Sequence, residues 1–178
     1  MSDFFELVKK RQSTRSFSDK PVEREKLVEI VDAARLSPSA CNSQPWKVIV
    51  AAEDKKIVTE VAESVALLGI NKYFANAPVF FVVLEEHAKL NRSIAQIVDS
   101  QIWAPGDLGG FTLTLCYAAE ELGLGTCVIG LFDRPRLREA LGLPLHAKIK
   151  LIVAAGYPST ENVRHKERKT LEEIATFV

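Results

Sequence analysis

The chain has 178 residues and a mass of 19.7 kDa, which predicts a single domain over residues 1–178. Hydrophobic residues make up 47% and charged residues 26%, which excludes a disordered chain. Lys and Arg equal Asp and Glu at 23 each, so no net field favours nucleic acid or an anionic membrane as a partner. The sequence has neither an apolar run of membrane-spanning length nor an apolar N-terminal leader, and we therefore expect a cytoplasmic protein.

The spacing of the cysteines and histidines predicts neither a disulfide framework nor a metal site. The cysteines are odd in number and lack a C-x-x-C pair, and the histidines stand far apart. We therefore expect no metal site. The residues concerned are Cys41, Cys116, Cys127, His87, His146 and His165.

Hydrophobic periodicity predicts alternating helices and strands. Helices are expected at Asp3–Arg11, Glu23–Arg35, Asp54–Leu68, Asp107–Leu122 and Arg134–Leu141. Buried strands are expected at Trp46–Ala52, Pro78–Leu84, Thr126–Leu131 and Lys148–Ala155. Polar loops fill Gln12–Val22 and Ser37–Pro45, and the polar stretch Gly156–Val178 is predicted to be an arm outside the core. This pattern indicates a layered α+β or α/β domain.

Glycines at Gly123, Gly125 and Gly130 imitate a dinucleotide-binding loop. That fingerprint requires a strand before the glycines and a helix after them, whereas here the order is reversed. We interpret Gly123 and Gly125 as a helix C-cap followed by a tight turn. Gly130 ends a predicted buried strand, where a missing side chain often marks close approach of the backbone to another group.

Basic residues gather near both ends of the chain. Lys9–Arg15 holds four cations and no carboxylate, which a solvated surface would explain on composition alone. However, Arg11, Ser13 and Arg15 alternate in an extended segment, so their side chains can point the same way and clamp a phosphate. Arg164–Lys169 is a second basic cluster. A phosphate dianion held between the two clusters would account for both.

The stretch Pro38–Trp46 combines two prolines with serine, asparagine and glutamine side chains. It is either a plain ordered turn or a loop that displays amides and hydroxyls to a heteroaromatic ring. Catalysis by the Cys41 thiol is not expected, because no histidine lies in a related loop. A Ser-His-Asp hydrolase is not expected either, because the G-x-S-x-G motif is absent.

Taken together, these segments resemble the FMN-dependent nitroreductase family. The resemblance spans nearly the whole chain in order. It rests on Arg11-x-Ser13-x-Arg15-x-Phe17, Pro38-Ser39-x-x-Asn42-x-Gln44-Pro45-Trp46, Gly123-Leu-Gly-Thr-x-x-Ile-Gly130-x-Phe132-Asp133, Ala155-Gly156-Tyr157-Pro158 and Lys166-x-Arg168.

This resemblance implies an α-β-α sandwich with a central mixed sheet, and a homodimer in which C-terminal arms of about residues 157–178 are exchanged. FMN would lie at the subunit interface. Its phosphate and ribityl end would meet one chain, the partner's loop would line the isoalloxazine ring, and backbone groups near Gly130 would reach the flavin N5. The implied cofactor-binding residues are Arg11, Gln12, Ser13, Arg15, Pro38, Ser39, Ala40, Asn42, Gln44, Ile129, Gly130, Leu131, Lys166 and Arg168.

Some positions depart from the family pattern. Gln12 replaces a second arginine, which weakens the charge of the clamp. Cys41 occupies a position beside the substrate cavity, and the short chain implies an open pocket around Trp103. The resemblance also implies that Asn71 and Lys72 would stand where polar residues meet the flavin pyrimidine edge, although the match in this segment is loose.

The implied activity is reduction of nitroaromatic, quinone or similar small acceptors by NADH or NADPH. No side chain is expected to be catalytic, because the cofactor carries the redox chemistry. NAD(P)H and the acceptor would use one exposed ring face in turn, which predicts two-electron ping-pong kinetics. The alternatives are an FMN-binding carrier or redox sensor without turnover, and a relative with other flavin chemistry such as dehalogenation or flavin fragmentation.

Overall fold

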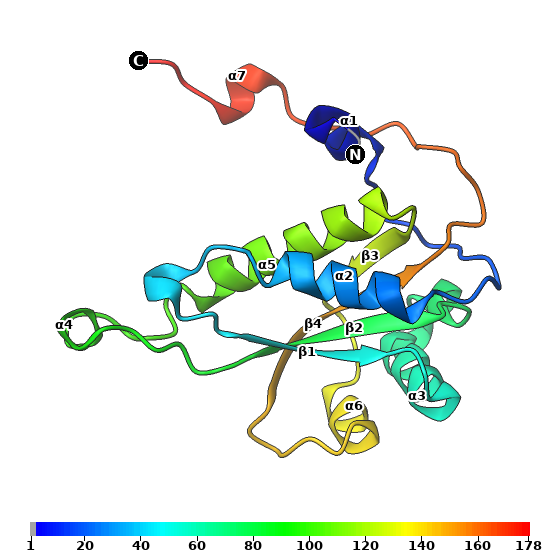
Figure 1. The fold of residues 1–178 in the computed structure, drawn as a ribbon, viewed down its shortest axis with the longest axis horizontal. Coiled ribbons are helices and arrows are strands. Elements are labelled where there is room, and N and C mark those ends of the chain that lie inside the picture. Colours follow the sequence, from blue (N-terminus) through cyan, green and yellow to red (C-terminus); the bar gives the residue numbers. More distant parts are fainter. Residues whose placement is uncertain (1–2) are drawn as a thin grey trace.

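A computed structural model describes residues 3–178 and places one sheet between two helical layers (Figure 1). The sheet has the strand order β1-β2-β4-β3. Its strands are β1 (Trp46–Ala51), β2 (Val79–Glu85), β3 (Gly125–Ile129) and β4 (Lys148–Gly156). The helices are α1 (Phe4–Lys10), α2 (Arg24–Ala34), α3 (Lys55–Val65), α4 (Arg92–Ala95), α5 (Ala104–Glu121), α6 (Arg134–Ala140) and α7 (Leu171–Ile174), and the 3₁₀ turns are η1 (Ala40–Asn42), η2 (Leu67–Gly69) and η3 (Lys72–Phe74).

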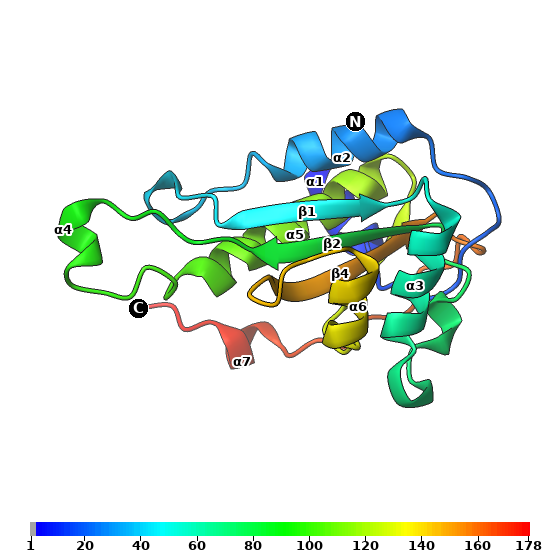
Figure 2. The same ribbon diagram turned by 90° about the horizontal axis from the view of Figure 1, so that it is seen from below.

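The two faces of the sheet carry separate apolar cores. Every residue of β2 is buried, as its unbroken apolar run predicts for a central strand. Alternate side chains of β2 point to opposite faces, so Phe80 joins the core beneath α3 and α6 while Phe81 joins the core beneath α2 and α5. Figure 2 shows the same layers from below. The expected α+β sandwich is confirmed.

The sheet is antiparallel throughout its strands, so the expected mixed sheet is wrong. Two connections, from β1 to β2 and from β3 to β4, each begin and end at the same end of the sheet. The register shows this, because Ala51 at the end of β1 pairs with Phe80 at the start of β2. Within residues 3–178, parallel pairing is confined to the isolated bridge between Ser13 and Thr126.

Element boundaries differ from expectation where tertiary contacts decide them. Helix α5 begins at Ala104, three residues before the predicted start, because Pro105 sits in the first turn, where no backbone donor is needed. The short helices α4 and α7 were not predicted, since four residues are too few for a periodic signal. None of the helices in the described part of the chain is long and apolar enough to cross a bilayer.

Gly123 and Gly125, the two glycines after α5, have different structural roles. Gly123 has φ +79°, which confirms the predicted helix C-cap. Gly125 is not in a turn but in β3, where a Cβ atom would lie 2.4 Å from Thr14 Oγ1. The tight turn expected at Gly125 is therefore wrong, because the residue is small to admit the N-terminal segment rather than to reverse the chain.

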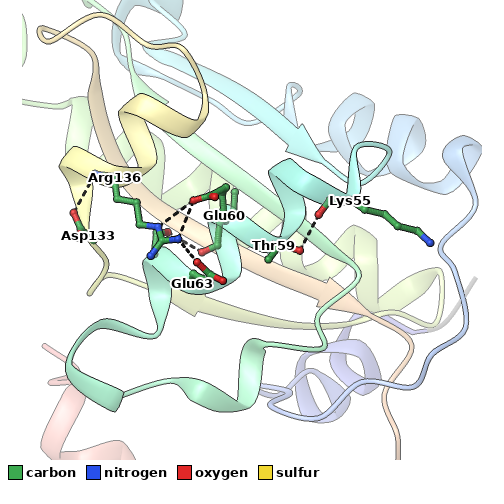
Figure 3. A network of polar contacts seen from close by, with 8 residues as sticks. Lys55, Thr59, Glu60, Glu63, Asp133 and Arg136 are labelled. Carbon is green, nitrogen blue, oxygen red and sulfur yellow. Dashed lines mark hydrogen bonds and ion pairs between the residues drawn. The ribbon is translucent and has the colours of Figure 1, made fainter.

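Polar contacts between α3 and α6 hold the segment that follows β3 (Figure 3). Arg136 binds Glu60 at 3.0 Å and also binds Glu63. Asp133 caps α6 by accepting from the Arg136 backbone N–H at 3.1 Å, and its own N–H donates to the Ser64 carbonyl at 2.8 Å. The path of residues 130–132 is thereby fixed at both ends.

Candidate functional site

A basic cleft of about 430 Å³ joins the two ends of the chain. One wall follows α1 and the other belongs to the polar segment after β4. The sequence places these walls about 150 residues apart, and the fold brings them together as the two basic clusters predict. The lining residues are Arg11, Gln12, Ser13, Arg15, Arg164, His165, Lys166, Glu167 and Arg168.

The N-terminal wall is fixed to the edge of the sheet. The Thr14 backbone N–H donates to the Thr126 carbonyl at 2.9 Å, in the space that Gly125 leaves free. Burial raises the pKa of the Cys127 thiol on β3, while the nearby Arg15, Ser13 and Arg11 oppose that rise. Ser13 forms an isolated bridge with Thr126 of β3, and Arg11, Ser13 and Arg15 line the same cleft, as their alternation predicts.

Gln12 attaches the C-terminal wall. Its Nε2 donates to the Asn162 carbonyl at 2.7 Å, and its Oε1 accepts from the Arg164 backbone N–H at 3.0 Å. Arg164 Nη2 also donates to the Ser13 carbonyl at 2.7 Å. Gln12 thus binds the arm, a role that its type alone did not indicate. Arg164 lines the cleft although it was not among the expected cofactor-binding residues.

Two cations in the cleft remain incompletely neutralised. Arg11 Nε is buried and has no hydrogen-bond partner among residues 3–178. Lys166 Nζ donates to the Val8 carbonyl at 3.3 Å and to the Lys9 carbonyl, at the C-terminal end of α1. Burial and the neighbouring Arg168 and Arg11 lower the pKa of Lys166. A buried donor and crowded positive charges fit a bound anion such as a phosphate dianion.

The end of β3 offers exposed backbone. Gly130 is exposed, and a Cβ atom there would meet nothing within 4 Å. The following Leu131 is 45% exposed, whereas Ile129 is 4% exposed and faces the core. Open space beside two consecutive peptide groups fits a flat ring that hydrogen-bonds to backbone donors.

The loop from Pro38 to Pro45 adopts an unusual backbone. Cys41, Asn42 and Gln44 have φ values of 53°, 52° and 47°, in the left-handed region that non-glycine residues rarely adopt. The Gln44 backbone N–H donates to Ser39 Oγ at 2.9 Å, and the Ala40 N–H donates to Asp107 Oδ1 at 3.2 Å. Such a strained, specifically bonded loop is typical of functional sites.

This loop and the basic cleft lie at opposite ends of α5. Asp107 in its first turn binds the loop, while Glu120 near its end pairs with Lys10 of α1 at 3.5 Å. Thirteen residues of helix separate them, which is about 20 Å. Figures 1 and 2 show η1 far from α1 in both views. One chain therefore does not bring the two halves of the expected site into contact.

The sequence profile of the nitroreductase family matches residues 8–157 of the chain. The chain belongs to the nitroreductase family. This confirms the resemblance and the expectation of an enzyme of that family.

Two curated proteins and one solved structure illustrate the similarity. A protein of Archaeoglobus fulgidus named as an NADH dehydrogenase/NAD(P)H nitroreductase is 30% identical, over 90% of this chain and 88% of its own length. The FMN reductase [NAD(P)H] of Bacillus subtilis is 28% identical, over 92% of this chain and 69% of its own. A nitroreductase of Exiguobacterium sibiricum, solved in complex with FMN, aligns with a TM-score of 0.85 at 18% identity, covering 100% and 98% of the two chains. At that identity it supports the fold.

Within this nitroreductase fold, Cys41 belongs to the strained loop itself, and Trp103 lies four residues before Asp107, which binds that loop. Trp103 immediately precedes α5 and is 40% exposed. Cys41 is an exposed free thiol within η1. Asn71, which precedes η3 with φ 62°, accepts a hydrogen bond from the Tyr73 hydroxyl at 2.8 Å. Asp107 was missed at the sequence level, because its partner Ala40 lies 67 residues away.

Proposed function

We propose that this nitroreductase-family flavin NAD(P)H oxidoreductase binds FMN and reduces nitroaromatic, quinone or similar small acceptors. The observation that carries the proposal is the basic cleft, in which both ends of the chain converge and the buried Arg11 Nε lacks a partner. NADH or NADPH is the proposed reductant, as in the names of the curated relatives. The acceptor follows NAD(P)⁺ at the same face, in a two-electron ping-pong sequence.

In this proposal the chain binds, orients and exposes the cofactor. Arg11, Ser13 and Arg15 hold the phosphate and ribityl end, and Lys166 and Arg168 complete the positive charge around it. Ile129, Gly130 and Leu131 present backbone toward the ring edge, in the open space beside Gly130. FMN, when bound, supplies the hydride chemistry, so no side chain of the chain needs to act as a nucleophile.

We propose that the other half of the site comes from a second copy of the chain. Pro38, Ser39, Ala40, Asn42 and Gln44 then meet the ring from the partner subunit. The separation of the two halves along α5 supports this arrangement. Exposed apolar side chains support it too: Phe4 and Phe5 on α1 are 61% and 69% exposed, and Leu113 on α5 is 49% exposed. Surfaces of this kind mark interfaces.

An absorption spectrum of the purified protein, followed by anaerobic titration with NADH and NADPH, tests the proposed activity. We expect a bound flavin that is bleached by one equivalent of at least one nucleotide and reoxidised by a quinone. A colourless protein that does not bind added FMN would contradict the flavin site. Bound FMN that neither nucleotide bleaches would instead favour a carrier or redox sensor.

A further inference from the structure

The chain between β2 and α5 forms an excursion, residues 86–103, that carries α4. It projects from the end of the sheet where the Pro38–Pro45 loop also lies, and both views agree on this placement (Figures 1 and 2). Apart from the buried Ala88 the excursion is mostly exposed, and Ile97 is 81% exposed. Few apolar contacts therefore hold it, and its position depends on polar contacts at its base.

Gln101 closes the base of the excursion. Its Oε1 accepts from the Ala88 backbone N–H at 2.6 Å, which joins the start of the excursion to its end. Its Nε2 donates to Glu85 Oε1 at 2.9 Å and to the Glu86 carbonyl at 3.2 Å. Ala88 is 2% exposed, so the loss of its bond to Gln101 would leave a donor in a buried position.

Glu85 fixes this closure to the sheet. Its side chain is 4% exposed and pairs with Lys150 at 2.6 Å and with Lys148 at 3.2 Å, both from the neighbouring strand β4. The two lysines of β4 thus orient the carboxylate of Glu85, which belongs to β2, independently of its bond to Gln101. The position of this buried carboxylate is therefore fixed, because any displacement would leave the charge without one of its partners.

The closure lies directly upstream of the proposed acceptor site. Gln101 is two residues before Trp103, whose exposed indole precedes α5. The first turn of α5 also holds Asp107, which binds the Ala40 N–H of the strained loop. Gln101 thus links Glu85, at the end of β2, to the start of α5, where the Ala104 N–H donates to the Gln101 carbonyl and the Asp107 N–H to the Trp103 carbonyl. Asp107 in turn binds the loop that is expected to face the ring.

We propose that Gln101 and Glu85 form a clasp that positions the excursion and Trp103 against the acceptor, and so determines the enzyme's specificity for bulky aromatic acceptors. Both are positioning residues, since neither is expected to touch cofactor or acceptor. The inference rests on the proposed flavin-dependent function. It adds to that function a structural basis for acceptor choice that does not involve the cofactor-binding residues.

Limited trypsin digestion of the FMN-loaded protein tests the clasp itself. The excursion offers exposed cleavage sites at Lys89 and Arg92. Gln101→Ala should speed cleavage there by about tenfold, because one lost hydrogen bond changes an opening equilibrium by roughly 2- to 10-fold and more than one is lost. Gln96→Ala, an exposed glutamine in the same excursion, is the matched control and should change nothing. Equal cleavage of both variants would overturn the clasp.

Steady-state kinetics with two acceptors test the effect on specificity. In Gln101→Ala, KM for a bulky naphthoquinone should rise about fivefold or more, since misplacement of a binding group weakens productive binding. The KM for ferricyanide, a small ion that needs no contact with the excursion, should stay unchanged. If cleavage accelerates but the two acceptors respond alike, the specificity role is wrong.

A second variant protects the test against misfolding. Gln101→Met keeps the length of the side chain without its donor and acceptor, so it should give the same cleavage and KM changes as the alanine variant if the hydrogen bonds are responsible. Wild-type behaviour of Gln101→Met would overturn the proposal. A wild-type protein that does not bind added FMN would instead contradict the proposed function, and trypsin digestion of the protein without FMN would still report on the clasp.

Discussion

Arg11 combines a fixed backbone with a buried side-chain donor that lacks a partner among the described residues. It ends α1, where its backbone N–H donates to the Leu7 carbonyl at 2.9 Å, and its buried Nε has no partner among the described residues. A fixed backbone holds the guanidinium in place, and an unsatisfied donor makes binding of an anion favourable. At the scale of single residues, this arginine gives the strongest support to the proposed phosphate site.

Replacement of Arg11 by alanine should weaken FMN binding without unfolding the protein. One charge-assisted hydrogen bond contributes about 1.5–3 kcal/mol, so the dissociation constant should rise roughly 10- to 150-fold. Titration of apoprotein with FMN, followed by quenching of flavin fluorescence, measures this. Arg35→Ala is the control, because Arg35 is exposed and pairs with Asp32 outside the cleft. Equal FMN affinity in both variants would remove Arg11 from the clamp.

Gln12 shows where inference from residue type ends. The alternation of Arg11, Ser13 and Arg15 predicted one shared face, and all three line the cleft. Gln12 was expected only to weaken the charge, yet its amide binds the arm at Asn162 and Arg164. Those partners lie about 150 residues away, so no local pattern in the sequence could indicate them.

Among the secondary-structure elements, β3 and the segment before α2 depend on each other through Gly125. Gly125→Ala should destabilise the protein by about 1–3 kcal/mol, because the new methyl group would overlap the Thr14 side chain. It should also reduce FMN retention, since Thr14 lies between Ser13 and Arg15. Chemical denaturation measures the first effect. The three nearest overlapping atoms all belong to the Thr14 side chain, so Thr14→Gly should restore stability only in the Gly125→Ala background. Strictly additive effects would contradict this contact.

The elements that the sequence predicted well are those with strong periodic signals. The run that became β2 and the apolar stripe that became α2 appear within a few residues of their expected bounds. The sequence could not distinguish parallel from antiparallel pairing, because buried strands have similar apolar patterns in both arrangements. The excursion that contains α4 was also missed, since the polar contacts of Gln101 with Ala88 and Glu85 close its base and no periodic apolar face marks it.

The whole molecule ends in an arm that has apolar side chains but little to pack them against. Leu171, Ile174 and Phe177 are 57%, 68% and 83% exposed, and α7 stands away from the sheet (Figure 1). Simultaneous replacement of all three by serine should convert a dimer into monomers, as measured by analytical ultracentrifugation. Lys169→Ser, at an exposed polar position of the same arm, should leave the dimer intact. A wild-type protein that sediments as a monomer would refute the exchanged arm.

The separation of the basic cleft and the strained loop along α5 has a genetic consequence. If each pocket takes its phosphate clamp from one polypeptide and its ring-lining loop from the other, defects in these two regions fall on different pockets. A mixed pair, one copy damaged at Arg11 and the other at Asn42, would contain one pocket with both lesions and one pocket with neither. Two inactive alleles expressed together would then restore up to half of the sites in every heterodimer.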